Sequence, residues 1–115
     1  MDQLTQSLYQ AAGDARLWEP ALVGLAERFR SAAATCLMYQ GLEAVGARTT
    51  PRMRDVSHAF FEQRMWENDG RIAHFQQTPI EHFVVTDQHF PAELLAQNEV
   101  LRMMAGLGLR HQAGA

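Results

Sequence analysis

Apolar residues recur at helical spacing in two stretches near the N-terminus. The first stripe comprises Leu4, Leu8, Ala11 and Ala12. Gly13 and Asp14 follow it and are typical of a helix end. The second stripe comprises Trp18, Leu22, Leu25, Ala26 and Phe29. Pro20 is compatible with the first turn of this second helix, where no backbone N–H is needed. We expect two amphipathic helices whose stripes pack in the core or against a partner helix.

The pattern then changes to short runs that suit strands. Ala34 to Tyr39 is too brief for a helix of its own and predicts a buried strand. Gly41 to Thr50 predicts a turn followed by a weak second strand, and Pro51 closes it.

A third helix is predicted from Met53 to Asn68. Its apolar positions cover about half of the helix circumference at 100° per residue, which is wider than packing against one neighbour requires. They are Met53, Val56, Ser57, Phe60, Phe61 and Met65. The helix is therefore expected to contact two partners, for example a sheet and a ligand. Trp66 falls outside this arc, so it either lies on the surface or forms the lip of a pocket or interface.

Shorter elements fill the C-terminal part. Ile72 to Gln77 predicts a short helix, and the β-branched and aromatic run Phe83 to Thr86 predicts a strand. A helical region follows from Asp87, and Asn98 is suited to start a new helix within it as an N-cap. Gly106 and Gly108 then supply the helix end.

These elements predict an α+β fold in which a small sheet is flanked by helices. Only two strands are firmly indicated, and two strands alone make a marginal sheet. Leu109 to Gly114 has the composition of the start of another strand. We therefore expect residues 1–115 to form a single, partial domain, or a domain whose missing sheet edge is supplied by a partner chain.

Composition and charge exclude several classes of protein. The chain has 115 residues, enough for one small domain, and a formal net charge of -3 with no lysine. The nearest basic cluster, Arg48, Arg52 and Arg54, has no interleaved aromatic residue, so direct nucleic-acid binding is not expected. There is neither a membrane-length apolar run nor a secretory signal, which predicts a soluble, cytoplasmic protein. The lone Cys36 is expected to be reduced and buried.

No catalytic or cofactor motif stands out. The chain lacks a Gly-rich phosphate loop, a Gly-x-Ser-x-Gly elbow and a Cys-x-x-Cys pair. His58 and Glu62 are four residues apart on the polar side of the third helix, but two ligands do not make a metal site. We expect no enzyme activity, no metal and no cofactor.

The order of motifs resembles a known family. A Leu-Trp-x-Pro-Ala-Leu helix is followed by a short strand, an aromatic helix that ends in Asn-Asp, a Thr-Asp strand end and Gly-Leu-Arg-His. This order resembles the N-terminal sensor domain of LuxR-type helix-turn-helix transcription regulators, in particular members with a PAS-like or GAF-like sensor. The resemblance covers nearly the whole chain. It implies a ligand-sensing and dimerisation domain whose DNA-binding half is absent.

The resemblance also implies a ligand pocket. The family's acyl-homoserine-lactone receptors place aromatic residues on the pocket helix and follow it with an aspartate that binds the ligand amide. Phe60 and Asp69 match these positions, whereas Gly70 stands where the receptors have proline, so acyl-homoserine lactone itself is not implied. The candidate ligand-binding residues are Tyr39, Phe60, Phe61, Met65, Trp66 and Asp69. Two alternatives remain for them: Asp69 caps the following short helix, and the apolar residues form plain core.

Two functions therefore stay open. The first is a sensor of a small, partly apolar effector, acting as a homodimer. The second is a pure protein interaction module that dimerises through its N-terminal helices and binds no small molecule. A cavity beneath the aromatic helix favours the first, and a filled core with an exposed apolar patch favours the second.

Overall fold

A computed structural model describes residues 2–77 and 84–114 of the chain. The fold divides into two compact units. The first unit comprises Met1–Gln40 and Ala44–His58, and the second comprises Gly41–Glu43 and Ala59–Ala115. Helices and strands both occur, which confirms the α+β class.

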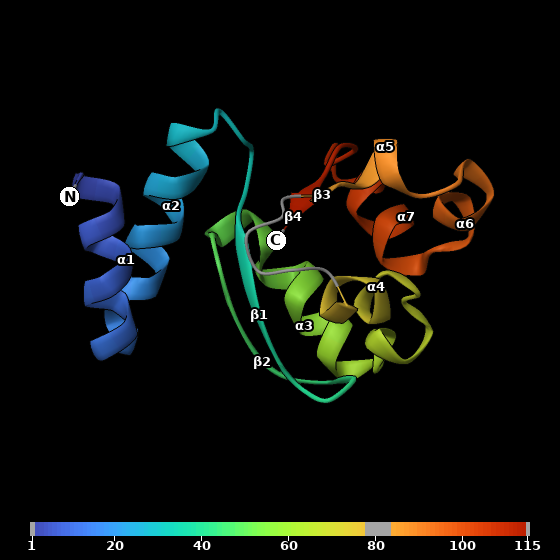
Figure 1. The fold of residues 1–115 in the computed structure, drawn as a ribbon, viewed down its shortest axis with the longest axis horizontal. Helices are drawn as coiled ribbons and strands as arrows, with labels where there is room; N and C mark the ends of the chain where they lie inside the picture. Colours follow the sequence, from blue (N-terminus) through green and yellow to red (C-terminus); the bar gives the residue numbers. More distant parts are fainter. Residues whose placement is uncertain (1, 78–83, 115) are drawn as a thin grey trace. The chain divides into compact units, whose positions relative to one another are not determined.

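Two helices open the first unit, as predicted. Helix α1 spans Gln3–Gly13 and begins where the Asp2 carboxylate accepts a hydrogen bond of 2.8 Å from the Thr5 backbone N–H. A 3₁₀ turn, η1 (Ala15–Leu17), leads into α2 (Trp18–Arg28). The two helices lie side by side (Figure 1). Of the predicted stripes, Ala11, Leu22 and Ala26 are buried, whereas Phe29 is exposed; Ala21, outside the stripe, is also buried.

The next element is a hairpin of two strands. Strand β1 spans Thr35–Gln40 and pairs with β2 (Glu43–Thr49), and Gly41 turns the chain with a φ of 63°. Beyond the strands, the Thr50 N–H donates to the Ala34 carbonyl at 3.0 Å. The predicted second strand is thus confirmed. The expectation that the first strand is buried was wrong, because a two-stranded sheet leaves most of the β1 side chains exposed.

The predicted third helix is shorter than expected. After a 3₁₀ turn, η2 (Pro51–Met53), helix α3 runs only from Arg54 to Glu62. Arg64 then adopts a left-handed conformation with a φ of 51°, and a further 3₁₀ turn, η3 (Met65–Asn68), follows. The helix ends because a left-handed residue cannot continue a right-handed helix. No glycine marks this position, so the sequence carried no signal for it.

In the described residues after η3, four short helices and a small sheet complete the second unit. The helices are α4 (Arg71–Gln77), α5 (Thr86–His89), α6 (Ala92–Gln97) and α7 (Glu99–Gly106). Strands β3 (Val84–Val85) and β4 (Ala113–Gly114) lie beside each other in Figure 1. They pair antiparallel, with Val84 opposite Gly114 and Val85 opposite Ala113. The predicted strand was longer, but its Phe83 lies outside the described residues, and Thr86 already begins α5.

The two predicted strand regions therefore belong to different sheets. Strand β1 pairs with β2, and β3 pairs with β4, so the described residues form two two-stranded sheets instead of one. The predicted start of a strand near the C-terminus is confirmed in its last residues. Among the described residues, no helix is long and apolar enough to cross a membrane.

Candidate functional site

An aromatic cluster lies where α3 gives way to η3. The ring centroids of Phe60 and Phe61 are 5.5 Å apart, and the Trp66 ring lies 5.9 Å from Phe60 and 5.8 Å from Phe61. Phe60, Met65 and Trp66 are buried, and Phe61 is half-buried. Trp66 fell outside the apolar arc of one long helix. The left-handed turn at Arg64 explains its burial, because the chain changes direction there and Trp66 packs back on α3.

An open hollow of about 560 Å³ lies beside this cluster in the second unit. It is lined by Leu42, Glu43, Arg64, Trp66, Glu67, Asn68, Asp69, Gly70, Ile72 and Ala73. The hairpin tip contributes two of these residues. The tip is held in the second unit by the Gln76 side-chain amide, which donates a hydrogen bond to the Gly41 carbonyl.

Asp69 stands in the wall of the hollow as part of a buried ion pair. The Arg71 guanidinium donates through Nε to Oδ1 at 2.9 Å and through Nη2 to Oδ2 at 2.7 Å. The Arg71 backbone N–H also donates to Oδ1, at 3.2 Å. The side chain of Asp69 is 3% exposed and that of Arg71 is 13% exposed, so the pair is shielded from water. This bidentate geometry is the strong form of an arginine–carboxylate contact.

The ion pair connects distant parts of the second unit. The Asn98 side-chain amide donates to Asp69 Oδ1 at 2.9 Å, while its Oδ1 accepts from the Leu101 N–H at 3.1 Å and so caps α7. The third nitrogen of Arg71, Nη1, donates to Gln112 Oε1 at 2.9 Å. Asp69 therefore joins the start of α4 to the start of α7 and, through Arg71, to the segment before β4.

The same contacts set the protonation of Asp69. Burial by itself raises the pKa of this carboxyl, but the hydrogen bonds and charge of Arg71, with the hydrogen bond from Asn98, outweigh burial. The pKa of Asp69 therefore lies below its ordinary value. The carboxylate is ionised at neutral pH, and both of its oxygens are engaged.

Arg64 places a second guanidinium at the hollow. Its Cζ atom lies 5.0 Å from the centroid of the Trp66 ring, and its Nε donates to Glu67 Oε1 at 2.5 Å. This is a cation–π contact combined with a carboxylate partner. The Arg64 side chain is 58% exposed, so it reaches the ring from the solvent side.

The predicted site residues thus divide into three groups. Trp66 and Asp69 line the hollow. Phe60, Phe61 and Met65 are not among its lining residues. The two phenylalanine rings pack on Trp66, and Met65 is buried. Tyr39 lies on β1 in the first unit, half-buried, and is not among the lining residues.

Sequence reasoning missed the charged partners of this site. Arg71 follows Asp69 after one residue, and this spacing was a usable signal for a local ion pair. Asn98 was identified as a helix cap, which is confirmed, but its second contact with Asp69 is 29 residues away in sequence. No local pattern indicates such a contact. The same holds for Gln112 and Arg71.

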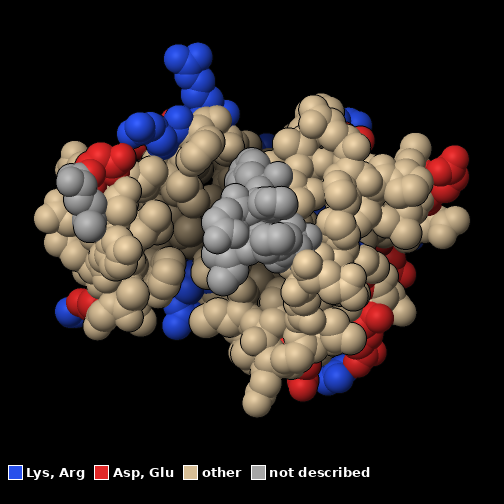
Figure 2. Space-filling view, in the orientation of Figure 1, with Lys and Arg blue, Asp and Glu red and all other residues tan. Residues whose placement is uncertain are grey.

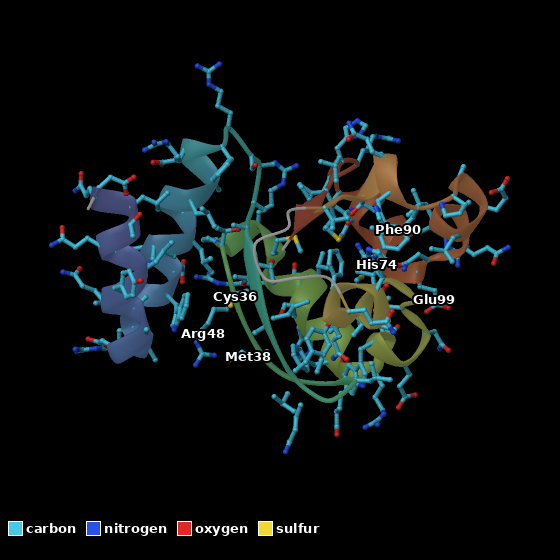
Figure 3. The ribbon with its side chains drawn as sticks, in the orientation of Figure 1. Cys36, Met38, Arg48, His74, Phe90 and Glu99 are labelled. Carbon is cyan, nitrogen blue, oxygen red and sulfur yellow. The ribbon has the colours of Figure 1, made fainter. Side chains whose placement is uncertain are left out.

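A second aromatic group contains two histidines. The rings of His74 on α4 and His89 on α5 have centroids 4.1 Å apart, and Phe75 and Phe90 surround them. Figure 3 shows His74 beside Phe90. Within residues 2–77 and 84–114, no group of three or more His, Cys, Asp or Glu side chains is placed to hold a metal ion.

Two arginines of the predicted basic cluster are engaged with other groups of the first unit. Arg54 donates to both oxygens of Glu19, at 2.7 and 2.8 Å, so its charge is paired. Arg48 donates through Nη1 to the carbonyl of Ala47 at 3.0 Å. On the face shown in Figure 2, basic and acidic side chains are interspersed among neutral ones.

The chain matches no protein-family model, no curated protein and no solved structure with significance. What it can do chemically therefore follows from its own residues. The hollow is lined by Trp66, by apolar residues and by the exposed acidic residues Glu43 and Glu67. Its wall is fixed by a buried ion pair.

Proposed function

We propose that this chain is a ligand-sensing domain that binds a small, partly apolar molecule in the hollow beside Trp66. The proposal rests on one observation, the hollow of about 560 Å³ whose wall contains both Trp66 and Asp69. Its size falls within the roughly 300–1,000 Å³ of small-molecule sites. Its lining combines apolar side chains with a few polar groups, as such sites do.

The ion pair supports a sensing role as well as a binding role. Because Asp69 bonds both Arg71 and Asn98, a change at the wall of the hollow is transmitted to the N-terminus of α7 and to the segment before β4. If this hydrogen-bond network has two arrangements, a ligand shifts the equilibrium between them when it binds one more tightly than the other. In this proposal Asp69 positions the wall of the hollow through its bonds to Arg71 and Asn98.

The family resemblance supplies the biological context of the proposal. The chain would be the sensor half of a LuxR-type transcription regulator with a PAS-like or GAF-like architecture, acting in the cytoplasm as a homodimer. Binding of DNA would belong to another part of such a protein. In this role the chain binds its effector without converting it.

The fluorescence of Trp66 gives a direct test. The chain has two tryptophans, so Trp18→Phe leaves Trp66 as the only indole. We expect members of a library of small amphiphilic molecules to change the emission of this variant saturably and to raise its melting temperature. Ile72→Asp, which places a charge in the apolar lining, should abolish both effects. A library in which no member does either would overturn the proposal.

A second candidate function is supported by the first unit. Its described residues expose large apolar side chains: Tyr9, Leu17, Phe29, Leu37, Met38 and Val45. Exposed apolar residues are typical of interaction surfaces when they are contiguous. We propose as the alternative that the chain is a protein interaction module that dimerises through this unit. Dimerisation without any ligand response would favour this alternative.

A further inference from the structure

We infer that the hollow beside Trp66 selects ligands with a positive charge, that is, organic ammonium or guanidinium compounds with a short apolar part. This inference deepens the proposed function and rests on it, because it names the class of molecule that the hollow binds. Within the lining, Arg64 already contacts Trp66 and Glu67.

The lining contains a cation site that is filled by the protein's own side chain. The Arg64 guanidinium lies over the Trp66 ring, with its Cζ 5.0 Å from the centroid, and bonds Glu67 at 2.5 Å. An aromatic face together with a carboxylate is the arrangement by which proteins recognise ammonium and guanidinium groups. The site therefore accepts a cation in the folded protein.

Arg64 is readily displaced from this position. Its side chain is 58% exposed and that of Glu67 is 50% exposed, and exposed ion pairs contribute little to stability. The long side chain can move into water and keep its charge hydrated there. A ligand cation that takes its place gains both the ring and the carboxylate.

The charge of the lining favours the same class of ligand. Three acidic residues line the hollow, Glu43, Glu67 and Asp69, against one basic residue, Arg64. Asp69 is neutralised by Arg71, and Arg64 is neutralised by Glu67. Glu43 is exposed at the hairpin tip, and no ion pair joins it to another described residue. The hollow thus has one excess negative charge.

The opposite charge is disfavoured on the same grounds. An anionic ligand would approach Glu43, and the only cation in the lining is already paired with Glu67. A neutral ligand would gain only apolar contact with Leu42, Ile72 and Ala73. The three classes should therefore bind in the order cation, neutral molecule, anion.

Three probes with the same apolar chain test this order: hexyltrimethylammonium, hexanol and hexanoate. Each is titrated into the Trp18→Phe protein while the emission of Trp66 is followed. We expect the ammonium compound to bind about tenfold more tightly than the alcohol, as a desolvated cation–π contact allows. Hexanoate should bind more weakly than the alcohol. Higher salt should weaken only the ammonium compound.

Variants assign the effect to individual groups. Glu67→Gln and Glu43→Gln should each weaken the ammonium compound by about threefold or more and leave the alcohol unchanged, because each removes a charge from the lining. Arg64→Gln should strengthen the ammonium compound, because the competing cation is gone. Glu93→Gln is the matched control. Glu93 is exposed on α6 and lies outside the lining, and this substitution changes the net charge of the protein by the same amount as Glu67→Gln or Glu43→Gln.

The possible failures are distinguishable. Equal binding of all three probes, or tightest binding of hexanoate, would overturn the charge selectivity and leave the proposed function standing. Glu93→Gln weakening the ammonium compound as much as Glu67→Gln would also overturn it, because the effect would then be one of net charge. If no probe of any charge binds and the wider library also fails, both the inference and the proposed function fall.

Discussion

The role of Asp69 in the structure is broader than the sequence predicted. From the sequence it was either a helix cap or a ligand contact. In the structure its carboxylate also forms a buried, bidentate ion pair with Arg71 and accepts a bond from Asn98. The cap is part of this arrangement, since the Arg71 N–H donates to Oδ1. The long-range bond could not be read from the sequence, because it depends on how α7 packs.

Replacement of Asp69 by asparagine is the sharpest test of this role. A simple cap would tolerate Asp69→Asn at a cost below about 1 kcal/mol. A broken buried pair leaves Arg71 without its counter-charge, so we expect a loss of about 3–5 kcal/mol in the free energy of unfolding. Urea denaturation measures it. Asp87→Asn is the control, because the Asp87–His111 pair is exposed and should lose less than about 1 kcal/mol.

The lowered pKa of Asp69 also predicts a pH dependence of stability. The folded pKa lies below the ordinary value of 3.8. The ionised pair therefore stabilises the folded state above that value, and this contribution is lost as the pH falls through the folded pKa. We expect the stability difference between the wild type and Asp69→Asn to be constant near neutral pH and to shrink below about pH 4. A constant difference down to pH 2 would contradict the lowered pKa.

At the scale of elements, the predicted end of a helix was correct where glycine marks it and wrong at Arg64, where no glycine does. Helix α7 ends at Gly106, with Gly108 at a φ of 81° and the Leu109 N–H donating to the Met104 carbonyl, as its glycines predicted. Helix α2 ends in the same motif with Arg30 in the left-handed position. A helix end at an arginine has no sequence signature. The similar turn at Arg64 is why the third helix was predicted to extend too far.

Arg30, two residues after the end of α2, has a left-handed backbone conformation that glycine would adopt more easily. Arg30 has a φ of 53°, and the Ser31 N–H donates to the Ala26 carbonyl at 2.8 Å. Because a left-handed conformation disfavours every residue with a Cβ, Arg30→Gly should stabilise the protein by up to about 1 kcal/mol. Thermal melts measure this change. Arg28→Gly, at the last residue of α2, should instead destabilise the protein by up to about 1 kcal/mol.

The start of α7 depends on Asn98 in two ways. Asn98→Asp keeps an oxygen that caps the Leu101 N–H, but it loses the amide that donates to Asp69 and places a second carboxylate beside it. We therefore expect Asn98→Asp to destabilise the protein by about 2 kcal/mol or more, although aspartate is as good an N-cap as asparagine. The destabilisation should decrease in acid, because protonation of either of the two neighbouring carboxyls removes the repulsion between them. A cap-only role predicts no change at any pH.

At the scale of the whole molecule, the order of elements could be predicted but their pairing could not. The N-terminal helices, the β1 and β2 region and the cap at Asn98 follow from periodicity and cap chemistry, which are local. Whether Ala34 to Tyr39 pairs with the next strand or with Val84–Val85 depends on long-range packing, and the structure places them in separate sheets. The hollow was beyond prediction for the same reason, since Leu42 and Trp66 both line it although they are 24 positions apart in the sequence.

The exposed apolar surface of the first unit favours self-association. Tyr9 is 69% exposed and Phe29 is 64% exposed, so both aromatic side chains remain largely in water. Burial of apolar area yields about 25 cal/mol per Å², which favours an interface that covers them. We expect light scattering to show a dimer at tens of micromolar, and Tyr9→Ser combined with Phe29→Ser to give a monomer with an unchanged melting profile at low concentration. Leu94→Ser in the second unit, 41% exposed, should leave the dimer intact. A wild-type protein that is monomeric at this concentration would remove the interaction role and the homodimeric part of the sensor proposal, and it would leave the ligand site as the remaining basis for function.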